Sequence, residues 1–227
     1  MLIGVVFFLF AFAEKRNSAR VLSEVNLNFT NSENLYLTEE AVNKLLIVNE
    51  VKVKSIGKET LDLSRVETLL ESHEMVESAE VFLTIDGKMG AEITQRKPLG
   101  RVMASAPFYI DRQGYKMPLS KYHSARVPLV TGVNEKNLVE IHPLMNYINN
   151  DEFLTRHVTQ LNRLPNGKFE IYLRQLDFVV VFGEVKDIEK KFKNFKAFYQ
   201  KALKDKKLDA YQKVDLQFGD QVVCTKK

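Results

Sequence analysis

The alternation of hydrophobic and polar residues predicts one strand and two helices early in the chain. From Val21 to Phe29 every second position is hydrophobic except Ser23, a pattern typical of a strand with one buried face. Thr38 precedes two glutamates, so it is predicted to cap a helix whose first turn is acidic. Ser64 and Glu67 have the spacing of a capping box, which predicts a second helix. Hydrophobic residues recur at helical spacing on both: Val42, Leu45 and Leu46 on the first, and Val66, Leu69 and Leu70 on the second.

Two further alternating runs predict a β-hairpin. They are Ala79–Ile85 and Met89–Gln95, with Asp86-Gly87 between them. Asp-Gly between alternating runs is a strong hairpin signal, because the turn it favours matches the twist of the flanking strands. Residues 21–97 are therefore predicted to form one small α+β unit, in the order strand, helix, helix, strand, strand.

Pro98 begins a second region, in which short extended segments accompany two amphipathic helices. The helices are predicted around residues 138–148 and over residues 184–207, where hydrophobic residues recur every three or four positions. The predicted strands are residues 101–103, 108–111, 115–117, 127–130, 158–163, 169–173, 176–182, 213–218 and 221–224. Residues 98–227 are therefore predicted to form a mixed α/β domain with a mainly antiparallel sheet.

The chain begins with an unbroken apolar run, Leu2–Ala13. Its twelve residues would extend about 18 Å as a helix, whereas the hydrocarbon core of a bilayer is about 30 Å thick. The run is either a signal-peptide core, with Ala11–Ala13 as the cleavage site, or the second half of a spanning helix whose start was lost. A buried core helix is disfavoured, because phenylalanines occupy every face and charged residues follow at once. The predicted fold class therefore includes an N-terminal membrane anchor, truncated, within residues 1–20.

Composition and motifs limit the chemistry. Hydrophobic residues make up 45% and charged residues 27%, which allows a packed core, and the net charge of +4 is too small to indicate nucleic-acid binding. Cys224 is the only cysteine, so neither an intrachain disulfide nor a thiolate metal cluster can form. The four histidines lack metal-ligand spacing, and the sequence has no phosphate-binding glycine motif and no nucleophile turn. No catalytic residue, metal site or cofactor is therefore predicted.

The predicted helix over residues 184–207 is rich in lysine. It carries nine lysines against four acidic residues, a face that could favour an anionic membrane surface. The favoured interpretation is a solvated outer face on a helix whose hydrophobic stripe packs against the sheet. Charge alone therefore assigns no partner to this helix.

Several short motifs, in the right order, resemble a known family. The strand–helix–helix–strand–strand unit, with Val76–Val81 at the entry to its second strand, resembles a POTRA domain. The region after it is similar to the FtsQ/DivIB family of bacterial cell-division proteins, and Val214–Phe218 resembles that family's penultimate "V-D-L-R-Y" strand. The other matching segments are Gln95–Pro98, Tyr109–Gly114, Met117–Pro118 and Pro128–Gly132. The resemblance covers essentially residues 1–224.

The resemblance implies a non-enzymatic scaffold of the division machinery that is essential for septum assembly. It implies a single-pass protein of the bacterial inner membrane, with most of its chain in the periplasm, at the division septum. The expected domains are a membrane anchor at 1–20, a POTRA domain at 21–97 and an FtsQ-type β domain at 98–227 with a C-terminal edge strand. The implied partners are an FtsB–FtsL-like coiled-coil pair and FtsK- or FtsW-like proteins, together with the membrane. Nucleic acid and small-molecule substrates are not expected.

The resemblance also implies where a partner binds. In this family the C-terminal edge of the β domain binds the FtsB–FtsL pair, and an edge strand offers unpaired N–H and C=O groups to an added strand. Carried over by motif, the partner-binding residues are Val214, Asp215, Leu216, Gln217 and Phe218, followed by Val222 and Val223. Gln217 and Phe218 replace the family's usual arginine and tyrosine, which removes one charge and one hydroxyl from the contact.

Two other classes of protein are disfavoured. A POTRA-bearing outer-membrane assembly or secretion factor, which receives client strands, would need several POTRA units or a run of barrel strands about ten residues long. Here one predicted unit is followed by a region with two amphipathic helices. An exported enzyme is disfavoured because nucleophile, metal and phosphate motifs are missing from the sequence.

Overall fold

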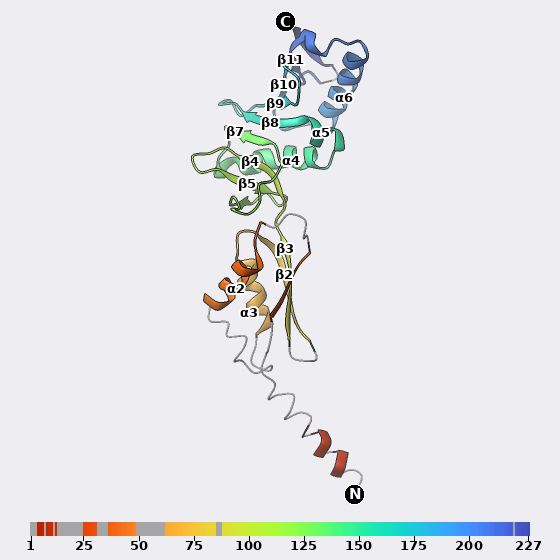
Figure 1. Cartoon of the computed structure of the whole chain (residues 1–227). Coiled ribbons are helices and arrows are strands. Elements are labelled where there is room, and N and C mark those ends of the chain that lie inside the picture. Colours follow the sequence, from red (N-terminus) through yellow and green to blue (C-terminus); the bar gives the residue numbers. More distant parts are fainter. Residues whose placement is uncertain are drawn as a thin grey trace. The chain divides into compact units, whose positions relative to one another are not determined.

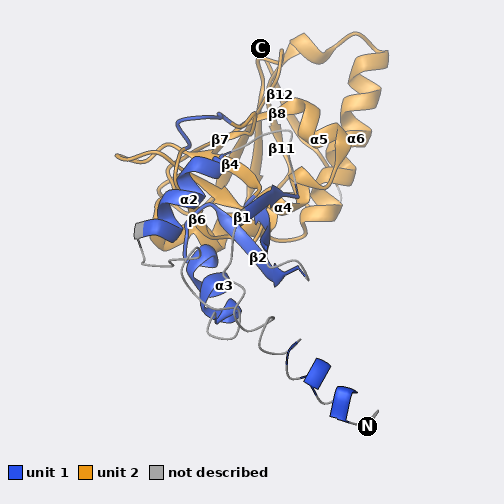
Figure 2. Ribbon diagram, turned by 60° about the horizontal axis from the view of Figure 1, so that its bottom comes forward, with its two compact units in different colours: residues 1–96, 120–124 blue, residues 97–119, 125–227 orange. Residues whose placement is uncertain are grey.

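The computed structural model describes residues 4–6, 8–10, 12, 25–30, 36–48, 62–84, 88–219 and 221–227 (Figure 1). The chain divides into two compact units, coloured separately in Figure 2. Unit 1 comprises residues 1–96 and 120–124, and unit 2 comprises residues 97–119 and 125–227. The assignment of these units to a POTRA domain and an FtsQ-type β domain stays a prediction.

Among the described residues, the predicted N-terminal membrane anchor is not found as a spanning helix. Residues 4–6, 8–10 and 12 are helical, and Phe8 and Phe10 are exposed. No helix in the described part of the chain is both long enough and apolar enough to cross a membrane. That part of the predicted fold class is wrong, and the physical reason is length, since the apolar run would extend only about 18 Å. The predicted combination of helices with β-sheets is consistent with both units.

Unit 1 contains five described elements in the predicted order. They are β1 (Val25–Phe29), α2 (Glu39–Val48), α3 (Leu63–Glu71), β2 (Val76–Leu83) and β3 (Met89–Gln95). The sheet order is β1-β3-β2, with β3 parallel to β1 and antiparallel to β2. The predicted turn at Asp86-Gly87 lies outside the described residues.

The two helices of unit 1 bury one face each. Leu46 on α2 and Leu70 on α3 are buried, as are Val81 and Ile93 on the sheet. The helical spacing also predicts that Leu69 is in this core. Leu69 is only partly buried, because it lies beside the face of α3 that carries the buried Val66 and Leu70. The segment 120–124 joins unit 1 through Ser120, whose hydroxyl donates to the Tyr36 carbonyl at 2.7 Å.

The ends of these helices show where the capping predictions succeed and fail. Thr38 caps α2 as predicted, because its hydroxyl accepts a hydrogen bond from the Ala41 N–H at 3.3 Å. The cap of α3 is Asp62, whose carboxylate accepts from the Arg65 N–H at 3.1 Å. The predicted Ser64–Glu67 capping box is therefore wrong, since both residues already lie inside the helix.

His73 is expected to make the stability of unit 1 depend on pH. Burial lowers the pKa of His73 below its usual value of about 6.5, although the neighbouring Glu74 carboxylate opposes this shift. Its Nδ1 also accepts a hydrogen bond from the Met75 N–H at 3.2 Å, which protonation of that nitrogen would break. Because the unfolded chain binds this proton more readily, the contribution of His73 to stability is present above about pH 6.5 and lost below it.

We therefore expect a larger loss of stability on acidification in the wild type than in His73→Asn. The Asn side chain can still accept from the Met75 N–H, but it does not titrate. Thermal unfolding at about pH 7.5 and about pH 5.5, followed by circular dichroism, measures the two losses. Equal losses in the two proteins would show that His73 does not carry this pH dependence.

Unit 2 is built on one nine-stranded sheet with the strand order β12-β11-β10-β9-β8-β7-β4-β5-β6. Its strands are β4 (Pro98–Val102), β5 (Phe108–Asp111), β6 (Lys116–Met117), β7 (Leu129–Thr131), β8 (Val158–Arg163), β9 (Phe169–Leu173), β10 (Val179–Gly183), β11 (Tyr211–Asp215) and β12 (Val223–Lys226). Its helices are α4 (Leu138–Asn149), α5 (Glu152–His157) and α6 (Ile188–Lys204), and short 3₁₀ turns span Glu135–Asn137 and Leu208–Ala210. The pairs β4–β7, β7–β8 and β10–β11 are parallel and the other five pairs are antiparallel, so the sheet is mainly antiparallel.

The core of unit 2 lies between the sheet and its helices. Ile141 on α4, Leu154 on α5 and Phe192 on α6 are buried in one cluster with hydrophobic residues of the strands. Phe192 stacks on Tyr147 with ring centroids 5.4 Å apart, and its ring lies 5.2 Å from that of Phe182. Aromatic contacts of this kind add to the free energy gained by burial, so they hold α6 firmly on the sheet.

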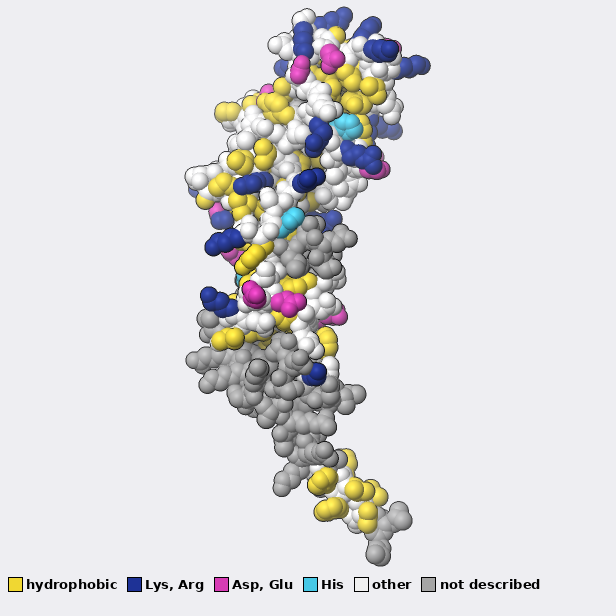
Figure 3. Space-filling model, in the orientation of Figure 1, with side chains coloured by type: hydrophobic (Ala, Val, Ile, Leu, Met, Phe, Trp, Pro, Cys, Tyr) yellow, Lys and Arg dark blue, Asp and Glu magenta, His cyan; other side chains and the backbone are white. Residues whose placement is uncertain are grey.

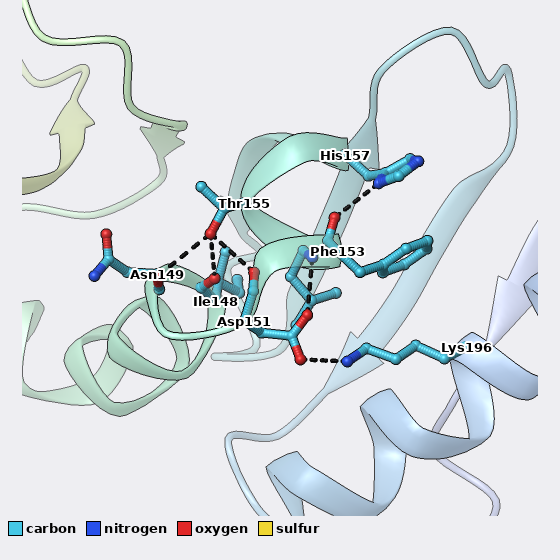
Figure 4. A network of polar contacts seen from close by, with 8 residues as sticks. Ile148, Asn149, Asp151, Phe153, Thr155, His157 and Lys196 are labelled. Carbon is cyan, nitrogen blue, oxygen red and sulfur yellow. Dashed lines mark hydrogen bonds and ion pairs between the residues drawn. The ribbon is translucent and has the colours of Figure 1, made fainter.

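A polar contact between α5 and α6 supports the same arrangement (Figure 4). Asp151 caps α5 by accepting from the Leu154 N–H at 3.0 Å, and it also pairs with Lys196 of α6. Burial opposes ionisation of Asp151, but hydrogen bonds from Lys196 and from backbone N–H groups outweigh it, so the pKa of this carboxyl is lowered. The carboxylate therefore stays charged near neutral pH and links the two helices.

Candidate partner-binding edge

The strand that the sequence predicted as the edge is paired on both sides. In β11, Val214 is opposite Val180 of β10 and opposite Cys224 of β12. Asp215 is likewise flanked by a residue of each neighbouring strand. The hypothesis that Val214–Phe218 offer bare backbone is therefore wrong, because the chain turns back after β11 and adds β12 outside it.

The residues that follow β11 are held by hydrogen bonds within unit 2. The Leu216 N–H donates to the Val181 carbonyl at 2.9 Å, and the Leu216 side chain is buried. The Asp215 carboxylate accepts from the backbone N–H of Gln217 at 3.0 Å and from its side-chain amide at 3.1 Å. The amide oxygen of Gln217 in turn accepts from Lys168 at 2.8 Å. The turn into β12 is therefore fixed by contacts of Asp215, Leu216 and Gln217. The Val214 side chain is buried in the core.

The edge of the sheet at this end is β12. The Lys227 N–H donates to the Ala210 carbonyl at 3.0 Å, so it faces the preceding strand. The backbone N–H and C=O groups of successive residues in a strand point to opposite sides of it. The backbone groups of Thr225 and Val223, which lie two and four residues before Lys227, therefore also point toward β11. The N–H and C=O groups of Cys224 and Lys226 then face away from β11. No described strand lies on that side.

Side chains around β12 provide both apolar and polar contacts. Phe218 is 51% exposed and Val223 is 41% exposed, while Val222 packs partly against the core. Cys224 is half-buried, and burial raises the pKa of its thiol, which keeps it protonated and weakly nucleophilic. Phe218 and Val223 are thus the partner-binding candidates that expose apolar side chains at this edge.

Two of the other three sheet edges in the described part of the chain are closed, whereas β1 of unit 1 is an edge strand that pairs only with β3. In unit 1, β2 is an edge strand, but α3 covers its donors: Glu71 accepts from the Ala79 N–H at 3.2 Å and Glu67 from the Val81 N–H at 2.9 Å. In unit 2 the opposite edge, β6, is only two residues long. Short strands and blocked donors are common protections against unwanted strand addition. By comparison, β12 presents its outward backbone groups openly.

The surface around β12 and α6 is basic. Residues 186–227 contain 12 lysines and six acidic residues, whereas the whole chain has a net charge of +4. Lys213 and Lys226, on β11 and β12, are exposed, and Figure 3 shows Lys and Arg side chains gathered at the end of unit 2 that carries the C-terminus. A field of this sign attracts acidic groups and accelerates their approach.

The described residues offer no obvious reaction centre. No group of three or more His, Cys, Asp and Glu side chains among them is arranged to hold a metal ion. The single cysteine has a raised pKa and no activating base among its described contacts. The features that remain at the C-terminal end are a backbone edge, exposed apolar side chains and positive charge, which suit binding of another chain.

Comparison with known proteins gives the family. The family model described as "FtsQ/DivIB, C-terminal related" matches residues 97–225, more than half of the chain and nearly all of unit 2. The chain belongs to the FtsQ/DivIB family. The resemblance inferred from the motifs is therefore confirmed. Because the match begins at residue 97, the likeness of unit 1 to a POTRA domain stays a prediction.

A curated relative points to the same family. The chain is 24% identical over 178 residues to "Cell division protein FtsQ" of Rhodothermus marinus. The alignment covers 72% of this chain and 65% of that relative, just under two thirds of the relative's length. Membership of the FtsQ/DivIB family supports a role in cell division.

Proposed function

We propose that this protein is a non-enzymatic scaffold of the cell-division machinery that binds a partner by adding the partner's strand to β12. The observation that carries the proposal is the open backbone of β12, in a sheet whose other edge is only two residues long. Family membership supports the division role, and we propose that the protein works at the septum. The alternative, an outer-membrane assembly or secretion factor, is not favoured because unit 2 matches the FtsQ/DivIB family.

The proposed partner is an FtsB–FtsL-like pair, with FtsK- or FtsW-like division proteins as further partners. A strand from the pair would accept from the N–H groups of Cys224 and Lys226 and donate to their carbonyl groups. Strand addition draws affinity from such main-chain hydrogen bonds and specificity from neighbouring side chains. Phe218 and Val223 would supply apolar contacts, and the lysines of β11 and β12 would favour acidic residues on the incoming segment.

The residues predicted from the motif take different roles in this proposal. Phe218, Val222 and Val223 lie on the turn and the edge, where a partner can reach them. The second group positions β12 and consists of Val214, Asp215, Leu216 and Gln217. Val214 and Asp215 pair with β12, Leu216 is buried, and Gln217 donates a hydrogen bond to Asp215. Substitutions in the second group are expected to act through the shape of the edge.

Cys224→Pro tests the proposed edge directly. Proline at this position removes a single N–H, the one that faces away from β11, so the ladder between β11 and β12 is retained. The partner would lose one hydrogen bond and be left with an unsatisfied carbonyl, which we expect to weaken binding by roughly tenfold or more. Binding to the purified FtsB–FtsL-like pair is measured by isothermal titration calorimetry.

Cys224→Ala is the matched control. It removes the thiol but keeps the N–H, and we expect its affinity to stay within about threefold of the wild type. Far-ultraviolet circular dichroism and thermal unfolding establish that both variants are folded. If folded Cys224→Pro bound the pair as tightly as Cys224→Ala, strand addition at β12 would be excluded.

A further inference from the structure

β1 is an edge strand of unit 1 that the proposed partner-binding role does not use (Figure 2). It pairs with β3 in a parallel register that runs unbroken from Val25 to Phe29, and no described strand lies on its other side. Edge strands are commonly protected from pairing by a charged residue, a proline or a bulge. β1 has the sequence V-N-L-N-F and contains none of these three.

The register shows which backbone groups of β1 point outward. The Thr30 N–H donates to the Ile93 carbonyl of β3 at 3.1 Å, so the backbone of Thr30 faces β3. Backbone groups of successive residues point to opposite sides of a strand, so those of Asn28 also face β3. The N–H and C=O groups of Leu27 and Phe29 then point away from β3. In the described part of the chain, no hydrogen bond engages these outward groups.

The sequence of β1 is self-complementary about its central residue. In an antiparallel pair of two copies centred on Leu27, each asparagine lies opposite the other asparagine of the second copy, and Val25 lies opposite Phe29. Leu27 lies opposite its own equivalent. Because the N–H and C=O of Leu27 point outward, the two equivalent residues exchange both of their hydrogen bonds. No charged residue takes part, so like charges do not oppose each other across the pair.

The side chains of β1 suit the same arrangement. Asn26 and Asn28 are exposed on one face of the sheet, whereas Leu27 is half-buried and Phe29 is 8% exposed on the other. A second β1 would cover the half-buried Leu27 with an equivalent leucine. It would also place asparagine beside asparagine on the exposed face, where amide groups can donate to and accept from each other. A pair with two-fold symmetry uses the same surface on both copies, so association ends at the dimer.

We infer that two copies of this protein associate through unit 1, by antiparallel pairing of β1 with β1 centred on Leu27. The two three-stranded sheets then form one continuous sheet in the order β2-β3-β1-β1-β3-β2. Each copy contributes a strand of only five residues, so the dimer is weak and reversible and forms where copies are concentrated. The contact does not involve β12, and it stands or falls independently of the proposed strand addition there.

Disulfide capture between two single-cysteine variants tests the pairing and its register. Both variants are made in the full chain with Cys224→Ala, so that the only thiol comes from Asn26→Cys in one and from Asn28→Cys in the other. In the proposed register, position 26 of one copy and position 28 of the other form a pair without hydrogen bonds. The Cα atoms of such a pair are about 4.5 Å apart, a separation that a disulfide spans.

The proposed register predicts a difference between the mixture and its components. Diagonal neighbours, such as position 26 of both copies, are about 7–8 Å apart, at or beyond the reach of a disulfide. Under mild oxidation in detergent solution, an equal mixture of the two variants is therefore expected to form a covalent dimer. Either variant alone is expected to form roughly tenfold less of it or none.

Leu27→Pro, added to both variants, tests the hydrogen bonds of the pair. It removes an N–H that points away from β3, so the pairing of β1 with β3 is retained. Leu27→Ala is the control that removes the same side chain but keeps the N–H, and it is expected to slow cross-linking of the mixture less than about fivefold. Leu27→Pro is expected to slow it roughly tenfold further, because both copies lose a donor.

Circular dichroism establishes that all variants are folded. Three results would each overturn the inference: no covalent dimer in the mixture, as much covalent dimer in either variant alone, or cross-linking of folded Leu27→Pro as fast as that of Leu27→Ala.

Discussion

Phe192→Ala is expected to lower the free energy of unfolding of unit 2 by about 3–5 kcal/mol. Phe192 is 1% exposed, and its ring contacts both Tyr147 of α4 and Phe182 of β10. Truncation would remove two aromatic contacts and leave a cavity between α6 and the sheet, which a helix pinned by the Asp151–Lys196 pair cannot fully close.

The neighbouring residue provides the control. Lys193 is exposed on the same helix, and Lys193→Ala is expected to change stability by less than about 0.5 kcal/mol. Urea denaturation followed by tyrosine fluorescence reports mainly on unit 2, which contains six of the eight tyrosines, and the chain has no tryptophan. A loss in Phe192→Ala no larger than that in Lys193→Ala would contradict the assignment of Phe192 to the core.

Gly132→Ala is expected to destabilise unit 2 by about 2–5 kcal/mol. Gly132 follows β7 with φ of +71°, a conformation unfavourable for residues with a Cβ atom. An added Cβ would also lie 2.0 Å from the Arg163 carbonyl oxygen, and a backbone atom cannot move away as a flexible side chain can. The conformation and the clash therefore act together.

Gly219→Ala separates these two effects. Gly219 also has a positive φ, +55°, but an added Cβ would meet no atom within 4 Å. We expect a cost of about 1–2 kcal/mol there, from conformation alone. Both variants are compared by the same urea denaturation. If Gly132→Ala lowered the free energy of unfolding no more than Gly219→Ala, the backbone at Arg163 would have to move aside without a measurable loss of stability.

Local signals in the sequence predicted much of the fold. Alternation and helical spacing gave the element order of unit 1, because those patterns record which face of each element is buried. In the sequence the segment Pro128–Gly132 indicates only a family likeness, and the structure gives a physical reason for its glycine, the close approach of the Arg163 carbonyl. Capping was less certain, because Asp62 and Ser64 both have side chains that can cap a helix.

Contacts between distant segments were not predictable in the same way. The position of Val214–Phe218 in the sheet depends on where β12 adds, and strand pairing is not encoded in the alternation of either strand. Glu67 looked like part of a cap, but it accepts from Val81 on β2, a contact that exists only once the hairpin lies beside α3.

Amide hydrogen exchange along β12 tests the proposed strand addition most directly. We predict that the N–H groups of Cys224 and Lys226 exchange rapidly in the free protein and become protected when the FtsB–FtsL-like pair binds. The N–H groups of Val223 and Thr225, which face β11, should be protected in both states. Formation of the complex with unchanged exchange at Cys224 and Lys226 would contradict the proposal that a partner strand pairs with this edge.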